Sequence, residues 1–409
     1  MAHARPLNGP VRGILAALVL AGPLAGCIGG PEGGRAARPA PAPRADLAPG
    51  PETPAAAPSP GKIGAGSVKV ALVVPLSGQG AALGAAMRNA AELAMEEFQQ
   101  PDIQVLVRDD RGTPDGAREA AQGALADGAE IVLGPLFAAN VQAAAAPVRA
   151  AGKPVIAFST DAGVAARGVY LLSFLPQAEV DRVVDEAVAG GRRSFAALIP
   201  ENAYGNAVEA RFREAVARKG ARVAGLERYA PGDAGPAIGR LAGVITGPAA
   251  QADALFVPET PDGLPGVAAA LSKAGFSPAR VRPIGTAQWN DPRVFSLPAL
   301  QGGWFAAPDP AGFSGFAGRY QARFGASPPR VASLAYDAVS LSAALSRQYG
   351  SQRFAETTLT GPAGFSGIDG TFRFQPEGLS DRALAVYEIR NNATVPVKPA
   401  PRLLAKSGT

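Results

Sequence analysis

Side chains that commonly carry out chemistry are few in this 409-residue sequence, which holds one histidine, His3, and one cysteine, Cys27. Both lie near the N-terminus, in a segment that we expect to be processed. Without His3 the chain has no Ser-His or Cys-His nucleophile pair and no His-ligated metal site. A single cysteine also allows no internal disulfide. We therefore expect a protein that is not an enzyme, with no catalytic residue, no metal and no cofactor.

Hydroxyl groups and glycines instead follow several apolar segments that read as strands. Hydroxyls and backbone N–H groups at helix N-termini can hold a carboxylate, because the helix dipole and its unpaired donors supply a positive field. The same residue types also cap helices and form turns, so a purely structural role stays open for each. The residues in question are Ser77, Gly78, Ser159, Thr160 and Tyr204.

Charge does not identify a partner. The sequence carries 39 basic and 34 acidic residues, a formal net charge of +5, and no long basic run. We therefore expect no nucleic-acid partner. The 50 glycines and 39 prolines suggest low complexity, whereas 47% hydrophobic residues favour a folded core, so the two signals must come from different segments.

The N-terminal segment has the pattern of a signal peptide. Arg5 and Arg12 precede an apolar run over residues 13–22, which is too short to span a bilayer as a helix. The following Leu-Ala-Gly-Cys27 resembles the lipobox of bacterial lipoproteins, in which the cysteine is acylated and becomes the new N-terminus. We expect residues 1–26 to be the signal peptide and Cys27 to be the lipidated residue that anchors the protein to a membrane.

Residues 27–66 are rich in Pro, Ala and Gly and present no apolar face. We expect them to form an extended, disordered tether between the acylated Cys27 and a folded body. By analogy with lipoproteins, Ile28 after the cysteine favours the outer membrane.

The body begins with Val68–Pro75, an apolar, β-branched run typical of a strand that is buried on both faces. Helical and strand patterns then alternate with short connections, which indicates doubly wound parallel sheets. The expected strands cover 68–75, 103–107, 131–133, 154–158, 195–199, 223–228, 254–257, 282–284, 303–307, 365–374 and 385–389. The expected helices cover 81–98, 115–125, 138–150, 178–189, 203–219, 236–244, 264–274, 313–324 and 332–347.

The fold class is therefore α/β, with two doubly wound, Rossmann-like lobes and a ligand cleft between them. We expect one lobe to combine residues 68–168 with 286–350, and the other to combine 169–285 with 351–392. Residues 393–409 are Pro-rich and basic and are expected to form a loose tail.

Several short segments carry a family resemblance. They are Val70–Gly78, Val132–Leu136, Pro154–Thr160, Ala203–Gly205 and Ala335–Val339. In this order they resemble type 1 periplasmic binding proteins of the Leu/Ile/Val-binding family over about residues 68–392. The segments Gly367–Gln375 and Arg382–Ile389 are similar to the C-terminal part of a lipoprotein branch known as penicillin-binding protein activators.

The resemblance implies a small, amino-acid-like ligand between the lobes, since ligands of doubly wound sheets bind beyond the carboxyl ends of the strands. The candidate ligand-binding residues are Ser77, Gly78, Leu136, Phe137, Ser159, Thr160, Asp161, Tyr204, Glu259 and Gln288. The chain departs from the family at two positions. The loop over residues 136–139 offers no hydroxyl, and Gly263 stands where amino-acid binders have an acid, so Glu259 or Asp262 could replace it only if the loop shifts.

Two enzyme classes compete with this interpretation. Gly78, Gly80 and Gly84 nearly form a dinucleotide-binding fingerprint, but the third glycine comes one residue late. A serine acyl-transfer enzyme needs a motif such as S-x-x-K, which occurs here only at Ser59–Lys62, within the expected tether.

Two functions from different classes remain. The first is a periplasmic, lipid-anchored receptor that binds a small, amino-acid-like ligand and passes it to an ABC permease. The alternative is a non-catalytic lipoprotein that activates a peptidoglycan synthase by docking to it. The family resemblance favours the first, whereas the long tether and the two departures favour the second.

Overall fold

The structure is a computed structural model that describes residues 61–99, 101–401 and 404. The expected signal peptide, Cys27 and the tether up to residue 60 lie outside the described residues. None of the described helices combines the length and the apolar character needed to cross a membrane.

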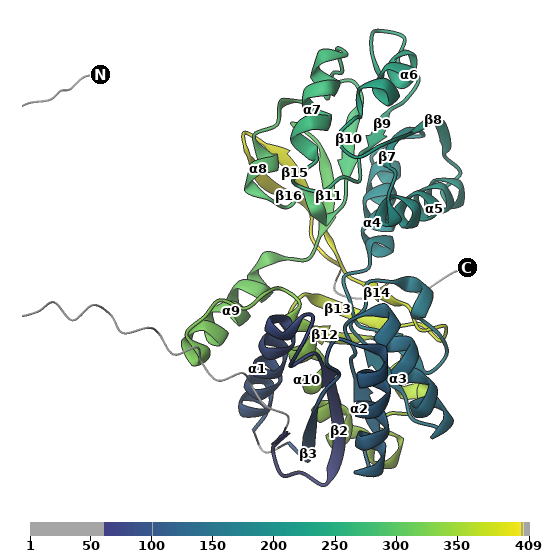
Figure 1. Cartoon of the computed structure of the whole chain (residues 1–409). Coiled ribbons are helices and arrows are strands. Elements are labelled where there is room, and N and C mark those ends of the chain that lie inside the picture. The colour runs from purple at the N-terminus through teal and green to yellow at the C-terminus, as the bar shows by residue number, and fades with distance from the viewer. Residues whose placement is uncertain (1–60, 100, 402–403, 405–409) are drawn as a thin grey trace, which may run out of the picture. The chain divides into compact units, whose positions relative to one another are not determined.

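The first sheet has six strands in the order β1-β3-β2-β4-β5-β6, and all neighbours are parallel except β1 with β3. Figure 1 shows β2 and β3 side by side in this sheet. Five residues of β2, Val70 to Val74, are fully buried, as expected for a β-branched strand covered on both faces. The strands are β1 Gly61–Ile63, β2 Val68–Val74, β3 Ile103–Asp109, β4 Ile131–Leu133, β5 Val155–Ala157 and β6 Val169–Leu171.

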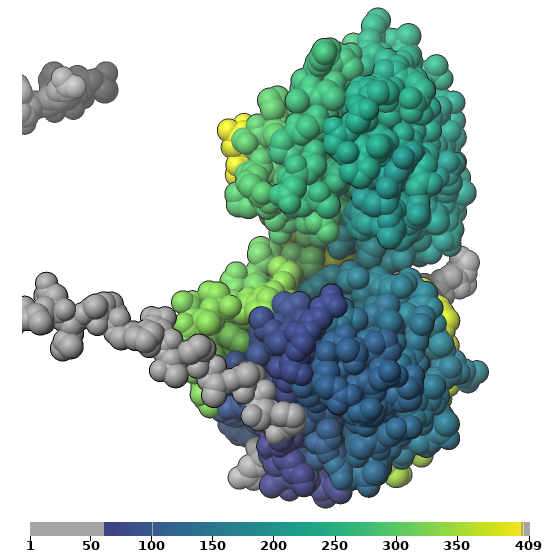
Figure 2. Space-filling view, viewed as in Figure 1, coloured from purple at the N-terminus to yellow at the C-terminus, as the bar shows by residue number. Residues whose placement is uncertain are grey.

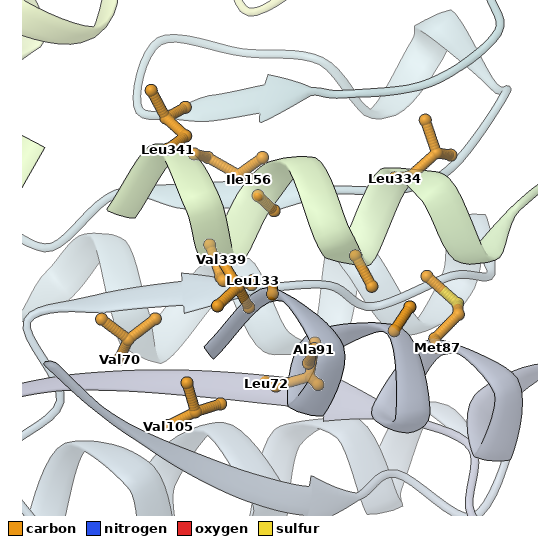
Figure 3. Close-up of a cluster of buried hydrophobic side chains, with 14 of the residues drawn as sticks. Val70, Leu72, Met87, Ala91, Val105, Leu133, Ile156, Leu334, Val339 and Leu341 are labelled. Atoms are coloured by element: carbon orange, nitrogen blue, oxygen red, sulfur yellow. The ribbon is translucent and has the colours of Figure 1, made fainter. Parts of the chain in front are cut away.

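Helices cover both faces of this sheet. Figure 3 shows Leu72 and Leu133 of the sheet facing Met87 and Ala91 of α1 and Val339 of α10. The opposite face packs against α2 and α3. These helices are α1 Ala81–Glu97, α2 Pro114–Ala126, α3 Ala138–Ala150 and α10 Ala332–Tyr349.

The second sheet has seven strands in the order β16-β15-β11-β10-β9-β7-β8. The pairs from β11 to β8 are parallel, and β15 and β16 add antiparallel strands at one edge. The strands are β7 Ser194–Pro200, β8 Arg222–Tyr229, β9 Ala254–Phe256, β10 Arg282–Gly285, β11 Trp304–Ala307, β15 Ala385–Arg390 and β16 Ala393–Lys398. One face packs on α4 and α5 and the other on α6 and α7. These helices are α4 Pro176–Ala189, α5 Ala203–Arg218, α6 Gly235–Ile245 and α7 Leu264–Lys273.

A third, antiparallel sheet of three strands packs on the core of the first lobe. Phe372 and Phe374 of β13 lie in that core, and the Phe374 ring lies 5.4 Å from Tyr170 of β6. Its strands are β12 Phe365–Gly367, β13 Gly370–Phe374 and β14 Ser380–Arg382. Figure 2 shows the surface of α9 (light green) beside that of α1 (purple), where Arg323 pairs with Glu92 and Glu96 across more than 200 residues of sequence. The remaining helices are α8 Pro292–Phe295, α9 Pro310–Phe324, α11 Glu356–Leu359 and the short 3-10 turns 162–164, 287–289, 298–300 and 350–352.

The chain passes between the two large sheets three times within the described residues, between β6 and α4, between β11 and α9, and between β14 and β15. We call these connections the crossings. By sheet membership the first lobe combines 61–171 with 310–382, and the second combines 176–307 with 385–398.

These boundaries differ from the expected ones. β6 pairs with β5, so residues 169–171 belong to the first lobe. β10 and β11 pair with β9 and with each other, so residues 282–307 belong to the second lobe. The segment 365–382 joins the first lobe because its phenylalanines fill that lobe's core.

Two expected unstructured segments also need correction at their ends. Gly61–Ile63, expected in the tether, form the edge strand β1, because Ile63 pairs with Val105 and packs on the first core. Residues 393–398, expected in a loose tail, form β16 because they hydrogen-bond to β15.

Candidate functional site

A cavity of about 910 Å³ lies where loops of both lobes meet the crossings. Thr160 and Asp161 follow β5, Gln288 follows β10, and Tyr204 lies in the first turn of α5. The ends of parallel strands and the starts of the following helices are where doubly wound sheets place ligands. Four of the ten candidate residues therefore line one cavity.

The loop after β5 holds its shape through its own side chains. The Oγ of Ser159 accepts a hydrogen bond from the Asp161 N–H at 3.1 Å, and Asp161 Oδ1 accepts one from Gly163 N–H at 2.8 Å. Ser159 is buried, whereas Thr160 is exposed and its hydroxyl makes no hydrogen bond with the described residues. The Thr160 hydroxyl is thus the group of this loop that is open to a ligand.

Tyr204 is fixed by its neighbours on the second lobe. Its hydroxyl lies 2.7 Å from the Oγ1 of the fully buried Thr286, and burial raises the pKa of the tyrosine. Asn202 caps the helix by accepting from Gly205 N–H at 2.7 Å. Glycine is required at 205, since a Cβ there would lie 1.9 Å from the Pro200 carbonyl oxygen. Tyr204 therefore presents a neutral hydroxyl beside the cavity.

An acid that the sequence interpretation missed, Glu179 in the first turn of α4, also lines the cavity. The residue is 9% exposed, and its Oε2 accepts a hydrogen bond from Ala287 N–H at 2.9 Å. Burial raises the pKa of Glu179 to about 7, against the smaller lowering effects of that hydrogen bond and of the Arg330 charge. An acid in a first helical turn normally indicates only a favourable dipole interaction, so its local pattern gave no functional signal.

Arg330 is the second missed residue. It precedes α10 and lines the same cavity. Its guanidinium group donates to the fully buried Asp369, whose other oxygen accepts from Ser333 at 2.6 Å. The guanidinium carbon also lies 5.3 Å from the ring centroid of Phe174 and 4.8 Å from that of Phe313. A salt bridge and two rings thus hold one cation at the cavity wall.

Like Ser159, four further candidates from the first lobe do not line the cavity, and the contact of these residues with a ligand stays a prediction. Ser77 donates its hydroxyl to Asp109 at 2.6 Å. Gly78 adopts φ 66°, and a Cβ there would come 2.5 Å from the Arg111 carbonyl oxygen. Phe137 precedes α3, and Leu136 packs on the first core. All four serve the turns that follow β2 and β4.

Glu259 does not line the cavity either. Its carboxylate is buried and accepts hydrogen bonds from the Tyr229 hydroxyl at 2.5 Å and from Thr260 N–H at 2.7 Å. A Cβ at Gly263 would come 2.6 Å from the Glu259 carboxyl carbon. Glu259 therefore stabilises its own loop, and the buried acid at the cavity comes from α4.

In the described part of the chain, no group of three or more His, Cys, Asp or Glu side chains is arranged to hold a metal ion. The lining groups are instead hydroxyls, amides and one charge of each sign on Glu179 and Arg330, with the exposed Asp161 at the loop. Such a set can orient and bind a small polar molecule.

Solved structures of known proteins resemble this fold. A Rhodospirillum rubrum protein assigned to branched-chain amino acid ABC transport is 20% identical, with a TM-score of 0.70 over 81% of this chain and 99% of that one. A leucine-binding protein from Thermotoga maritima is 17% identical, with a TM-score of 0.54 over 81% and 98%. A solute-binding protein of an ABC transporter from Rhodopseudomonas palustris, solved with 3,4-dihydroxybenzoic acid, is 20% identical, with a TM-score of 0.57 over 84% and 99%.

At such identities the similar structures establish the fold alone, and no curated protein sequence matches the chain. The family model described as periplasmic binding protein matches residues 67–394, which is well over half of the sequence. The chain therefore belongs to the periplasmic binding protein family.

Proposed function

We propose that this protein is an extracytoplasmic solute-binding lipoprotein of the Leu/Ile/Val-binding type. It binds a small, amino-acid-like ligand between its lobes and presents it to an ABC-type permease. The observation that carries the proposal is the cavity of about 910 Å³, which receives Thr160 from one lobe, Tyr204 from the other and Arg330 beside the crossings.

The chemistry of the cavity suits binding rather than catalysis. Its volume lies within the range of ligand sites, about 300–1,000 Å³. The Thr160 hydroxyl, the Gln288 amide and the Arg330 guanidinium are groups that bind and orient polar ligands, and the neutral Tyr204 hydroxyl, whose pKa burial raises further, adds another. Proteins of similar structure were solved with 3,4-dihydroxybenzoic acid, isoleucine and leucine, which are all small carboxylic acids.

The crossings supply the mechanical part of the proposal. Domain closure around a ligand bends the chain at a few residues between rigid bodies. Here the residues between β6 and α4, between β11 and α9, and between β14 and β15 are the connections that can bend. Closure would enclose the ligand between the loops and form the surface that a permease recognises.

A thermal-shift screen of the purified full chain against the proteinogenic amino acids and benzoate tests this function. A ligand at a hundred times its Kd adds about 2.7 kcal/mol to the free energy of unfolding, which raises the Tm by several degrees. Thr160→Ala and Tyr204→Phe should reduce the shift.

The matched control is Thr357→Ala, an exposed residue of α11 that does not line the cavity. It should leave the shift unchanged. A screen in which no compound changes the Tm of the wild-type chain contradicts the proposed function.

We further propose that Cys27 carries lipid that anchors the protein to a membrane on the periplasmic side, the outer membrane in preference to the inner. Support comes from the Leu-Ala-Gly-Cys27 sequence directly after the apolar run. Cys27→Ser should move the protein from the membrane to the soluble fraction, whereas Ser59→Ala in the tether should not. A Cys27→Ser protein that still sediments with membranes contradicts the anchor.

Activation of a peptidoglycan synthase stays a prediction that rests on the C-terminal resemblance, the long tether and the two departures from the family, and no feature of the cavity favours it. The screen above bears on it directly, because a pure docking protein needs no small ligand.

A further inference from the structure

The cavity carries two buried or anchored charges that neither the sequence motifs nor the family positions assign. Resting on the proposed function, we propose that Arg330 and Glu179 determine specificity, with Arg330 binding the carboxylate and Glu179 the ammonium group of a zwitterionic ligand. The pair would select zwitterions over simple carboxylic acids and simple amines.

Arg330 has donors to spare. Among the described residues, Asp369 is the one acceptor of a hydrogen bond from its guanidinium group, and its side chain is 37% exposed. A guanidinium group carries five N–H donors in a flat fork that matches a carboxylate. Asp369 and the Phe174 and Phe313 rings fix the side chain before any ligand arrives. The remaining donors are therefore preorganised for an anion at the cavity wall.

Glu179 has the complementary property. One carboxylate oxygen accepts from the Ala287 N–H, and the other makes no hydrogen bond with the described residues. Among the described residues, no Lys or Arg side-chain nitrogen lies within 4.0 Å of the Glu179 carboxylate, although the residue is nine-tenths buried. A buried carboxylate without a cation is costly, and a ligand ammonium group would remove that cost.

The two groups face the same space. Both line the one cavity, and the Arg330 charge is close enough to lower the pKa of Glu179. Phe174, from the crossing that leads into α4, lies beside Arg330 and also lines the cavity. The small residues Ala203 and Ala207 of α5 line another part of the wall and leave room for a ligand side chain.

The other charged residue of the lining does not compete for this role. Asp161 is exposed and its Oδ1 caps the Gly163 N–H, so an ammonium group gains little there from leaving water. Glu179 is the acid for which pairing with a ligand changes the free energy most.

The first experiment compares three forms of one ligand by isothermal titration of the full chain. Leucine is compared with 4-methylpentanoate, which lacks the amine, and with isoamylamine, which lacks the carboxylate. The same series uses phenylalanine, 3-phenylpropanoate and 2-phenylethylamine. In at least one series the amino acid should bind at least about tenfold more tightly than either truncated form, since a charged hydrogen-bonding group is removed each time.

The second experiment crosses these ligands with two variants. Arg330→Gln should weaken the amino acid at least about tenfold while leaving the weak binding of the amine unchanged. Glu179→Gln should weaken the amino acid by a similar factor and leave the binding of the carboxylic acid unchanged or tighter. This crossed pattern assigns each charge to one end of the ligand.

Matched variants separate these effects from loss of structure. Glu186→Gln changes an acid of the same helix that pairs with Arg182 and does not line the cavity. Asp369→Asn removes the ion pair of Arg330 but keeps the guanidinium group, and Arg330→Lys keeps a charge there. Glu186→Gln should bind as the wild type does, and Asp369→Asn should lose less affinity than Arg330→Gln.

The outcomes distinguish this inference from the proposed function. Benzoate or another simple acid binding as tightly as any amino acid leaves a solute-binding protein but overturns the zwitterion site. Amino-acid binding that neither Arg330→Gln nor Glu179→Gln weakens overturns the residue assignment alone. A wild-type chain that binds none of these compounds overturns both.

Discussion

The turn between β2 and α1 and the lining of the cavity use polar groups in opposite ways. In the turn, the Ser77 hydroxyl donates a hydrogen bond to the Asp109 carboxylate, which also accepts hydrogen bonds from the backbone N–H groups of Leu76 and Arg111. In the cavity lining, Glu179 and Arg330 each have hydrogen-bonding groups that the described residues do not use. The turn is satisfied by its own chain, whereas the cavity lining holds groups that a ligand can still satisfy. Polar groups with unfilled capacity therefore indicate the site better than hydroxyls at strand ends do.

The largest expected effect tests the rigidity of the turn region. Gly84→Ala places a Cβ 1.8 Å from the Pro75 carbonyl oxygen, so the backbone must move, and we expect a loss of about 3 kcal/mol or more in the free energy of unfolding. Gly123→Ala in α2 meets no atom within 4 Å and should add about 0.5–1 kcal/mol. Urea denaturation of both variants measures the difference, and equal stabilities would contradict a tightly packed turn.

The next largest effect tests the contact between Asp369 and Arg330, which holds the Arg330 side chain at the cavity wall. Asp369→Asn replaces a fully buried carboxylate that Arg330 and Ser333 both contact, and we expect a loss of about 2 kcal/mol in the free energy of unfolding. Asp115→Asn, whose partner Arg118 is half exposed, should cost less than about 1 kcal/mol. A negligible loss at Asp369 would mean that Arg330 is not held as we infer.

A pH effect of intermediate size sharpens the comparison, since burial raises the pKa of Glu179 and of Asp337 to about 7. At pH values between the ordinary pKa of these carboxyl groups and pH 7, the groups stay protonated in the folded chain but are ionised in the unfolded chain. The stability contributed by these groups is therefore present at low pH and declines as the pH rises towards 7. We expect a decline of about 2 kcal/mol between pH 5 and pH 8 from each of these two groups.

Denaturant titrations of the unliganded wild type and of Glu179→Gln at both pH values measure this contribution. The variant should show a smaller decline, and Glu186→Gln should retain the full one. A decline that is identical in all three chains would show that Glu179 does not titrate between these pH values.

The smallest expected effect tests whether the turn between β2 and α1 takes part in ligand binding. Ser77→Ala removes an exposed hydroxyl bonded to Asp109, and we expect a loss of about 1 kcal/mol in stability with no change in ligand affinity. Calorimetric titration with the best ligand of the screen measures the affinity. A tenfold weaker Kd would return Ser77 to the site, as the sequence first suggested, and would remove the contrast between the two regions.

Much of the fold could be predicted from local patterns. The β-branched segment 68–74 and the helical spacing over 81–97 closely match the expected β2 and α1. Both the family and the α/β class of the prediction are confirmed. Periodicity reports which face of an element is buried, and in these long elements it is unambiguous.

The errors occur where long-range pairing decides. β1 and β16 are edge strands with few apolar residues, so nothing in their composition distinguishes them from a tether or tail. Likewise β11 reads as a strand, but its sheet is set by pairing with β10 and β15. The positions of Glu179 and Arg330 could not be predicted either, because the two residues are about 150 positions apart in the sequence and only the fold brings them to one cavity.

The alternation of the chain between its lobes has a consequence for synthesis. The first core needs Phe374 as well as Val70, and the second sheet needs β15 as well as β7. Neither half can close until almost the whole polypeptide has emerged from the ribosome. A nascent chain of three hundred residues thus still lacks α10 and β13 of the first core and three strands of the second sheet, a condition that suits passage through a narrow translocation pore.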